Sequence, residues 1–221
     1  YKFANEIYAN EVAILPYYIA NLNIEYTFKQ KMDRYAEFPN LCFVDTLDNV
    51  GALSYRGQVK DLFGLTSENL QRIKRQNEQR ISVIIGNPPY NANQLNENEN
   101  NKNRDYPIID KRIKDTYVEH STAQKTKVYD MYARFYRWAS DRIDNNGVLA
   151  FITNRSFIDS RTFDGFRKCL QEEFEFAYII DLGGNIRELS GKDGIYLNEQ
   201  HTIFGVAAAI GIAMMFLVKK P

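Results

Sequence analysis

The chain has 221 residues, of which 44% are hydrophobic and 25% charged, a composition typical of one globular domain with one sizeable core. Its 28 Lys and Arg residues balance its 28 Asp and Glu residues, so no overall positive field attracts nucleic acid and any DNA contact must be local. Cys42 and Cys169 lie far apart, and His120 and His201 stand alone, which argues against a metal centre and a histidine-based hydrolase. This cysteine usage also favours a reducing compartment, and we expect a cytoplasmic protein.

Hydrophobic periodicity divides the N-terminal part of the chain into helices and strands. In chain order, we expect a helix over residues 12–28, a strand over 41–44, a helix over 67–80 and a strand over 81–86. Pro16 is tolerated only in a first turn, so the first helix should begin close to Glu11. Residues 81–86 are short and β-branched, which is typical of a buried strand in a parallel sheet.

The C-terminal part of the chain continues the alternation after a long polar segment. Residues 91–126 are rich in asparagine without a sustained apolar period, so we expect a long polar loop that is either functional or disordered. Beyond this loop we expect a helix over 127–143, a strand over 148–153, a helix over 162–173 and a strand over 178–182. Strands that alternate with helices predict a mostly parallel α/β sheet, which binds ligands at the carboxyl ends of its strands.

The apolar stretch 203–218 is the most membrane-like part of the chain. It is shorter than the ~20 apolar residues that span a bilayer, and glycines and alanines dilute it. The pattern therefore favours a buried strand or strand pair over a transmembrane helix, and we expect no membrane partner.

The motif Asn87-Pro88-Pro89-Tyr90 directly follows the predicted strand 81–86. Independent residue usage gives on the order of one chance match per thousand chains of this composition. Two successive prolines fix an extended backbone, so the Asn87 side chain and the Pro88 carbonyl are held in a constant geometry beyond the strand end. The simpler alternative is a Pro-Pro turn without catalytic meaning.

This arrangement suits methylation of an exocyclic amine, whose lone pair is delocalised into the base. Acceptors on Asn87 and Pro88 can bind the two N–H groups, stabilise the developing positive charge and direct the lone pair at a methyl donor. Tyr90 offers a flat face on which the base can stack. An adenine inside a duplex cannot reach such a pocket, so it must be flipped out.

On these residues the chain resembles the amino-directed DNA methyltransferases of the gamma arrangement, in particular the methylase domains of single-chain restriction-modification enzymes of the ISP and IIG-like types. The NPPY motif carries the resemblance, and further segments follow in the order of the family's motifs. These segments are 7–25, 43–47, 129–132, 153–157, 181–185, 203–205 and 218–220.

The resemblance implies a Rossmann-like class I methyltransferase sheet, mostly parallel, that transfers a methyl group from S-adenosylmethionine to adenine N6 in double-stranded DNA. It assigns Glu11 to the cofactor ribose hydroxyls, Asp45 to the cofactor adenine amine and Phe204 to the flipped base, and it places Asn87 beside the cofactor. Taken alone, Glu11 is equally compatible with a helix-terminal acid and Asp45 with a turn residue. The resemblance also implies that the polar loop 91–126 faces DNA, and we expect the loop to be mobile without DNA. Within the loop, we expect local phosphate contacts from basic residues, namely Lys102, Arg104, Lys111 and Arg112.

The chain departs from the family pattern because the glycine-rich first cofactor motif does not precede Glu11. We therefore expect residues 1–221 to be a partial S-adenosylmethionine domain, incomplete at its N-terminal side, whose parent chain supplies the cofactor loop and a target-recognition domain. The central strand before that loop would also be missing, so the strands ending at Glu11 and Gly86 should each keep one unpaired edge. The isolated fragment should bind the cofactor weakly and show no methylation.

Two other functions remain open at this point. The first is an NPPY methyltransferase that acts on another planar amine, such as an rRNA guanine or a protein glutamine. The second is a non-catalytic remnant that serves as a DNA-contacting scaffold, which the missing first motif suggests.

Overall fold

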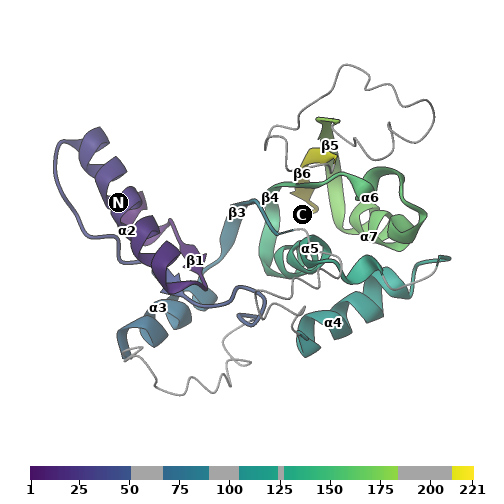
Figure 1. Ribbon diagram of the computed structural model, residues 1–221, viewed down its shortest axis with the longest axis horizontal. Helices are drawn as coiled ribbons and strands as arrows, with labels where there is room; N and C mark the ends of the chain where they lie inside the picture. Colours follow the sequence, from purple (N-terminus) through teal and green to yellow (C-terminus); the bar gives the residue numbers. More distant parts are fainter. Residues whose placement is uncertain (51–66, 90–104, 124–126, 184–210) are drawn as a thin grey trace. The chain divides into compact units, whose positions relative to one another are not determined.

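The computed structural model describes residues 1–50, 67–89, 105–123, 127–183 and 211–221 (Figure 1). The chain divides into two compact units, unit 1 over Tyr1–Gln79 and unit 2 over Arg80–Pro221, where composition predicted one domain. Each unit has its own sheet.

In its described residues, unit 1 contains a short parallel sheet and three helices. Its elements are α1 (Lys2–Asn5), β1 (Ala9–Glu11), α2 (Ile14–Met32), β2 (Leu41–Phe43) and α3 (Ser67–Glu78). In the parallel ladder, Ala9 lies opposite Leu41 and Glu11 lies opposite Phe43. The first long helix begins close to Glu11 with Pro16 in its first turn, as predicted.

The buried part of unit 1 combines apolar and polar side chains. Its apolar members lie on β2 and the segments beside it and on α3; they are Phe38, Leu41, Cys42, Val44, Leu47 and Ile73. Among the polar members, the buried Glu25 of α2 accepts hydrogen bonds from the Phe38 backbone N–H at 3.0 Å and from the Tyr35 hydroxyl at 2.9 Å. The Glu25 carboxylate therefore connects α2 by hydrogen bonds to the segment that leads into β2.

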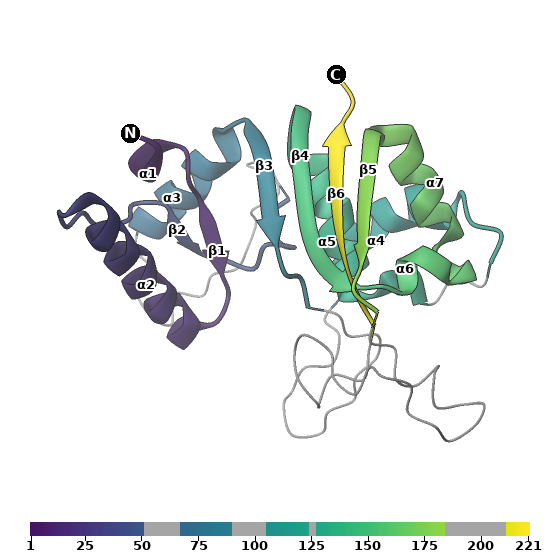
Figure 2. The same ribbon diagram turned by 90° about the horizontal axis from the view of Figure 1, so that it is seen from above.

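Unit 2 contains a four-stranded sheet with strand order β3-β4-β6-β5. Its elements are β3 (Ile81–Gly86), α4 (Pro107–Ile113), π-helix η1 (Lys114–Val118), the 3-10 turns η2 (Lys127–Tyr129) and η3 (Arg161–Phe163), α5 (Met131–Arg142), β4 (Ile143–Asn154), α6 (Ser156–Asp159), α7 (Asp164–Glu173), β5 (Phe174–Asp181) and β6 (Ile212–Lys219). β3 and β4 pair in parallel, whereas β6 runs antiparallel to both β4 and β5 (Figure 2). Three of the four strands thus share one direction, which confirms the mostly parallel α/β sheet.

Among the described residues, the strands β1, β2, β3 and β5 each have one unpaired edge. β1 pairs with β2 alone in that part of the chain, and β3 pairs with β4 alone. This agrees with the expectation that the strands ending at Glu11 and Gly86 lack a common neighbour. An unpaired edge leaves backbone N–H and C=O groups to be satisfied by solvent or another chain segment.

Aromatic side chains form the core of unit 2. Tyr136 on α5 contacts Phe151 of β4 and Phe166 of α7 edge to face, with ring centroids 5.0 and 5.3 Å apart. Phe166 also packs against Tyr117 of η1 at 5.0 Å. The aromatic helix predicted from the sequence therefore packs in the core, as its composition indicated.

The segment 91–126 is not a loop throughout, which corrects the sequence prediction. Residues 107–118 form α4 and η1, and the buried side chains Ile109, Ile113 and Tyr117 anchor them in unit 2. These residues repeat at helical spacing, a period that the surrounding polar residues concealed. The expected loop is therefore replaced by helical structure over residues 107–118.

The predicted bounds of β4 and of the C-terminal strand also change. β4 begins at Ile143, directly after α5, and Asn146 adopts the left-handed conformation with φ 60°. The stretch 203–218 includes strand β6, so the alternative of a buried strand is confirmed for residues 212–218. No helix in the described ranges is long and apolar enough to cross a membrane.

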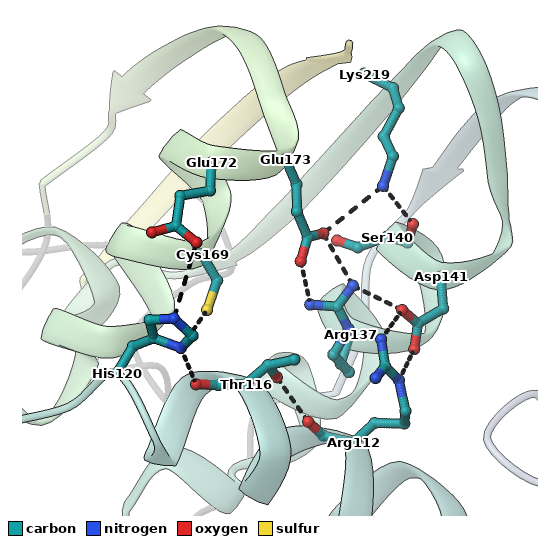
Figure 3. A network of polar contacts seen from close by, with 10 residues as sticks. All are labelled: Arg112, Thr116, His120, Arg137, Ser140, Asp141, Cys169, Glu172, Glu173 and Lys219. Atoms are coloured by element: carbon teal, nitrogen blue, oxygen red, sulfur yellow. Dashed lines mark hydrogen bonds and ion pairs between the residues drawn. The ribbon is translucent and has the colours of Figure 1, made fainter. Parts of the chain in front are cut away.

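A buried ion-pair network joins α4, α5, α7 and β6 (Figure 3). The Arg137 side chain donates from Nη1 to Glu173 Oε1 and from Nη2 to Asp141 Oδ1, both at 2.7 Å. Arg112 binds the same Asp141 carboxylate at 2.7 and 2.8 Å. Since Arg137 is only 1% exposed, its partners compensate for the loss of hydration.

Candidate active site

The predicted cofactor residues of unit 1 lie at the ends of neighbouring strands. Glu11 is the last residue of β1, and Asp45 follows the end of β2 by two residues. The Val44 backbone N–H donates to the Glu11 carbonyl oxygen at 3.0 Å, which keeps the two strand ends in register. The parallel pairing therefore brings both acids to one edge of the β1–β2 sheet.

Glu11 also organises the start of α2. Its Oε1 atom accepts hydrogen bonds from the backbone N–H groups of Val12 and Ala13, each at 2.8 Å. Free N–H groups at a helix start favour a carboxylate in this position. Both bonds use one oxygen, so Oε2 has no donor in the described part of the chain.

Asp45 lies in a turn, which was its alternative interpretation. Its Oδ1 atom accepts from the Leu47 backbone N–H at 3.0 Å, and its carbonyl accepts from Asp48 N at 3.1 Å. An aspartate that bonds to the backbone two residues ahead stabilises such a turn. The turn orients the Asp45 carboxylate beyond the end of β2.

The Asn-Pro-Pro part of the motif lies at the carboxyl end of β3 in unit 2. Pro88 is buried, whereas the Asn87 and Pro89 side chains are exposed. Asn87 has no hydrogen-bond partner within the described ranges. An exposed amide before a rigid Pro-Pro is available to an incoming group.

Gly86 allows a close approach of the aromatic core to this motif. Gly86 lies opposite Phe151 in the β3–β4 ladder, and a Cβ atom at Gly86 would lie 3.0 Å from Cε1 of the Phe151 ring. A larger residue would therefore press on the ring directly beside Asn87. Because Gly86 lies directly against the Phe151 ring, the start of the motif is packed against the core of unit 2.

A second polar group lies at the strand ends of unit 2, and sequence reasoning did not identify it. The Arg155 guanidinium, which follows β4, donates to both carboxylate oxygens of Asp181 at the end of β5. Arg155 and Asp181 lie at or just after the ends of predicted strands, and this position was the signal in the sequence that could have identified them. Their pairing depends on the strand order, which the sequence did not reveal.

Of the remaining predicted site residues, some lie outside the described ranges and others form ion pairs within unit 2. Tyr90, Phe204, Lys102 and Arg104 lie outside the described residues. Lys111 forms an ion pair with Asp115, one turn further along the helical segment. Arg112 forms a bidentate ion pair with Asp141, so a phosphate contact by Arg112 would compete with this pair.

Hydrogen bonds from arginine lower the pKa of two acids in unit 2. A hydrogen bond from Arg155 holds the pKa of Asp181 below its ordinary value, against a smaller effect of burial. For Asp141, burial raises the pKa, but hydrogen bonds and charges from Arg112 and Arg137 outweigh it, so the pKa is lowered. Burial raises the pKa of the Cys169 thiol to about 11, which leaves it unreactive at neutral pH.

Comparisons with known proteins agree with the resemblance seen in the motifs. The model of the Eco57I restriction-modification methylase family matches residues 5–186. Three solved structures match 99% of the chain: the DrdV–DNA complex at 53% identity and TM-score 0.84, a nuclease-deletion mutant of the type ISP restriction-modification enzyme LlaGI with a DNA substrate mimic at 41% and 0.85, and the ATP-dependent type ISP restriction-modification enzyme LlaBIII bound to DNA at 39% and 0.85.

The chain spans only a fraction of these proteins. It covers 20% of the DrdV chain, 18% of the LlaGI chain and 14% of the LlaBIII chain. A search of curated protein sequences gave no match.

Proposed function

The chain belongs to the Eco57I restriction-modification methylase family, and from this premise we propose that it forms part of a DNA methyltransferase that methylates adenine N6 with S-adenosylmethionine. The observation that carries the proposal is the placement of Asn87 and Pro88 at the carboxyl end of β3. In open α/β sheets, this edge binds ligands. The Asn87 amide is exposed there and unpaired among the described residues.

Asn87 and Pro88 would act on the target amine. The Asn87 amide oxygen and the Pro88 carbonyl oxygen each accept one N–H of the exocyclic amine. As the nitrogen becomes tetrahedral and positively charged, both contacts strengthen, so the pair stabilises the transition state more than the ground state. The two prolines fix the backbone before the substrate binds, so no backbone conformational entropy is lost when the amine meets these acceptors.

The acids of unit 1 fit the adenosine part of the cofactor. Glu11 offers Oε2 for the ribose hydroxyl groups, because Oε1 is engaged by Val12 and Ala13. Asp45 lies at the neighbouring strand end, where its carboxylate can accept from the adenine amine. When bound, S-adenosylmethionine supplies a methyl group on a positively charged sulfur.

Duplex DNA is the favoured substrate. The DrdV, LlaGI and LlaBIII structures are complexes with DNA or a DNA mimic, and all three resemble this chain closely. A target adenine would have to leave the base stack to reach Asn87, which costs a few kcal/mol. Stacking of the flipped base on Tyr90 and Phe204 would offset part of this cost. The parent chain would supply the remaining cofactor contacts and the recognition of the DNA sequence.

The test is substitution of Asn87 in the full-length parent protein. Asn87→Ala should slow transfer of a tritiated methyl group to DNA by about 10²-fold to 10³-fold, with little change in DNA affinity, because one preorganised contact to the reacting nitrogen is lost. Asn145→Ala is the matched control, since Asn145 is an exposed asparagine of unit 2 outside the motif segments. Transfer at the wild-type rate by Asn87→Ala would contradict the proposal.

A further inference from the structure

A bidentate ion pair connects two strand ends in unit 2. Arg155 directly follows β4 and donates from Nε to the Asp181 oxygens at 3.0 and 3.1 Å and from Nη2 to Oδ2 at 2.8 Å. Asp181 is the last residue of β5. Since β6 lies between β4 and β5, the pair reaches across a whole strand. Planar forks of this kind fix both distance and orientation.

The same arginine packs closely against the chain that enters β6. The Arg155 backbone N–H donates to the Gly211 carbonyl oxygen at 2.9 Å. A Cβ atom at Gly211 would lie 2.3 Å from Cδ of Arg155, so only glycine leaves room for the arginine stem. Gly183 completes the arrangement: its N–H donates to Asp181 Oδ1 at 3.0 Å, and its carbonyl accepts from Ile212 N at 2.9 Å.

We call Arg155, Asp181, Gly183 and Gly211 the carboxyl-edge clasp. Gly183 and Gly211 are the described residues on either side of the connection between β5 and β6. The clasp therefore holds both ends of this connection against the end of β4.

The charges around Arg155 argue against a role in binding phosphate. Besides Asp181, the Asp159 carboxylate lies 2.8 Å from Nη2 of Arg155. Two carboxylates on one guanidinium leave a local excess of negative charge, which repels a phosphate group. Only 18% of the Arg155 side chain is exposed, so its donors face the protein. An arginine in this setting orients other groups instead of binding DNA.

The clasp lies at the sheet edge that carries Asn87. β4 is the neighbour of β3, and Gly86 lies opposite Phe151, three residues before the end of β4. Thr153 and Asp181 both lie opposite Ala213 of β6, which brings the ends of β4 and β5 to the same level. A small displacement of these ends would change the walls of any site built around Asn87.

We propose that Arg155 is a positioning residue for methyl transfer: through Asp181 and Gly211 it holds the ends of β4, β5 and β6 in the arrangement that places the target base against Asn87. The inference rests on the proposed function. In this role Arg155 does not touch the base and acts only by holding the strand ends in position. Misplacement of a reacting group by about 1 Å can cost about 10²-fold in rate.

The experiment uses the full-length parent with three variants. Arg155→Met removes the fork, and Arg155→Lys keeps the charge without the bidentate geometry. Arg80→Met is the matched control, because Arg80 starts unit 2 in an exposed ion pair with Asp144, 3.6 Å away. Tm, DNA affinity and single-turnover methyl transfer are measured for each, with transfer assayed well below each variant's own Tm so that every sample is folded.

We expect Arg155→Met to lower the rate of methyl transfer without a comparable loss of DNA affinity. Arg155→Met should slow methyl transfer by about tenfold to 10²-fold, with DNA affinity within about twofold of wild type. Arg155→Lys should recover part of the rate, and Arg80→Met should match wild type. A purely structural role would lower Tm but leave the rate of the folded protein unchanged, and that result would overturn the inference.

Failure of the proposed function would be recognised separately. If the wild-type parent transfers no methyl group to adenine in DNA, the function proposed above is wrong. If wild type is active and Arg155→Met transfers as fast as Arg80→Met, only the positioning role is wrong.

Discussion

Unit 1 and unit 2 differ in how they use apolar side chains. In unit 1, the long helix α2 leaves large apolar residues in solvent, with Leu15 67% and Leu22 66% exposed. In unit 2, the aromatic residues of α5 and α7 are enclosed, and Tyr136 and Phe166 are 0% exposed. Apolar burial therefore stabilises the part of unit 2 around α5 and α7, whereas much of the apolar surface of α2 is not buried and polar contacts such as those of Glu25 hold that helix. Unit 2 also has exposed apolar side chains, among them Ile85 on β3 and Tyr178 on β5.

One buried charged residue in each unit illustrates this difference. Arg137 in unit 2 is held by two carboxylates within an aromatic core. Glu25 in unit 1 accepts backbone and side-chain hydrogen bonds beside a small apolar cluster. Removal of a buried charge leaves its partners uncompensated, so each residue can be used to test the stability of its own unit.

The largest effect on stability is expected at Arg137. Arg137→Met should lower the free energy of unfolding of unit 2 by about 3–5 kcal/mol, because the partly buried Glu173 would lose its main partner and Asp141 one of its two arginines. The single tryptophan, Trp138, lies in this unit, so its fluorescence in urea reports the loss. Lys168→Met, at an exposed position of α7, is the control. An unchanged unfolding midpoint would show that the network contributes little.

Glu25 should have a smaller effect, confined to unit 1. Glu25→Ala leaves the Phe38 N–H without its acceptor and should cost about 1–3 kcal/mol. Faster hydrogen exchange of the Phe38 amide would confirm this, with the Trp138 signal unchanged. Glu6→Gln, at an exposed position of the same unit, should leave the exchange rate as in wild type. Equal loss in both units would mean that they unfold together.

Acid should weaken unit 2 through Asp141. Its pKa is below the ordinary value in the folded state, so its stabilising contribution is complete above the unfolded pKa of about 3.9 and is lost as pH falls through the lower folded pKa. Unfolding measured from about pH 6 to about pH 2 should therefore show a steeper decline for wild type than for Asp141→Asn. Parallel curves for the two proteins would exclude Asp141 as a source of acid sensitivity.

The smallest effect is expected on the exposed side of α2. Leu22→Gln should change the stability of this chain by no more than about 0.5 kcal/mol, because the leucine is already in water. Leu149→Ala in β4 is the contrast, since this residue is fully buried and should cost about 2–5 kcal/mol. Urea titrations of both variants test the difference between the two units directly. A large loss from Leu22→Gln would show that α2 is covered in solution.

Local patterns were sufficient to predict much of this molecule. Short β-branched runs predicted the strand β3, Pro16 placed the start of α2, and the rigid Asn-Pro-Pro sequence located the candidate site at the end of β3. The burial expected for residues 81–86 was wrong, because Val83 is 55% and Ile85 78% exposed on this edge strand. These features depend on residues close together in the chain, so their physical causes can be read from the sequence. The helical period that includes Ile109 and Ile113 was also present but was masked by polar neighbours.

The amino-acid sequence by itself determined the strand–helix alternation, the Asn87-Pro88-Pro89 motif and the family to which they point. Only the tertiary structure decided that Arg155 meets Asp181 and that Arg137 joins Glu173 to Asp141. Each of these pairs depends on strand order or helix packing, which bring together residues that are distant in the chain. Because a charged side chain pairs with whichever partner the fold places beside it, no local pattern could identify these contacts.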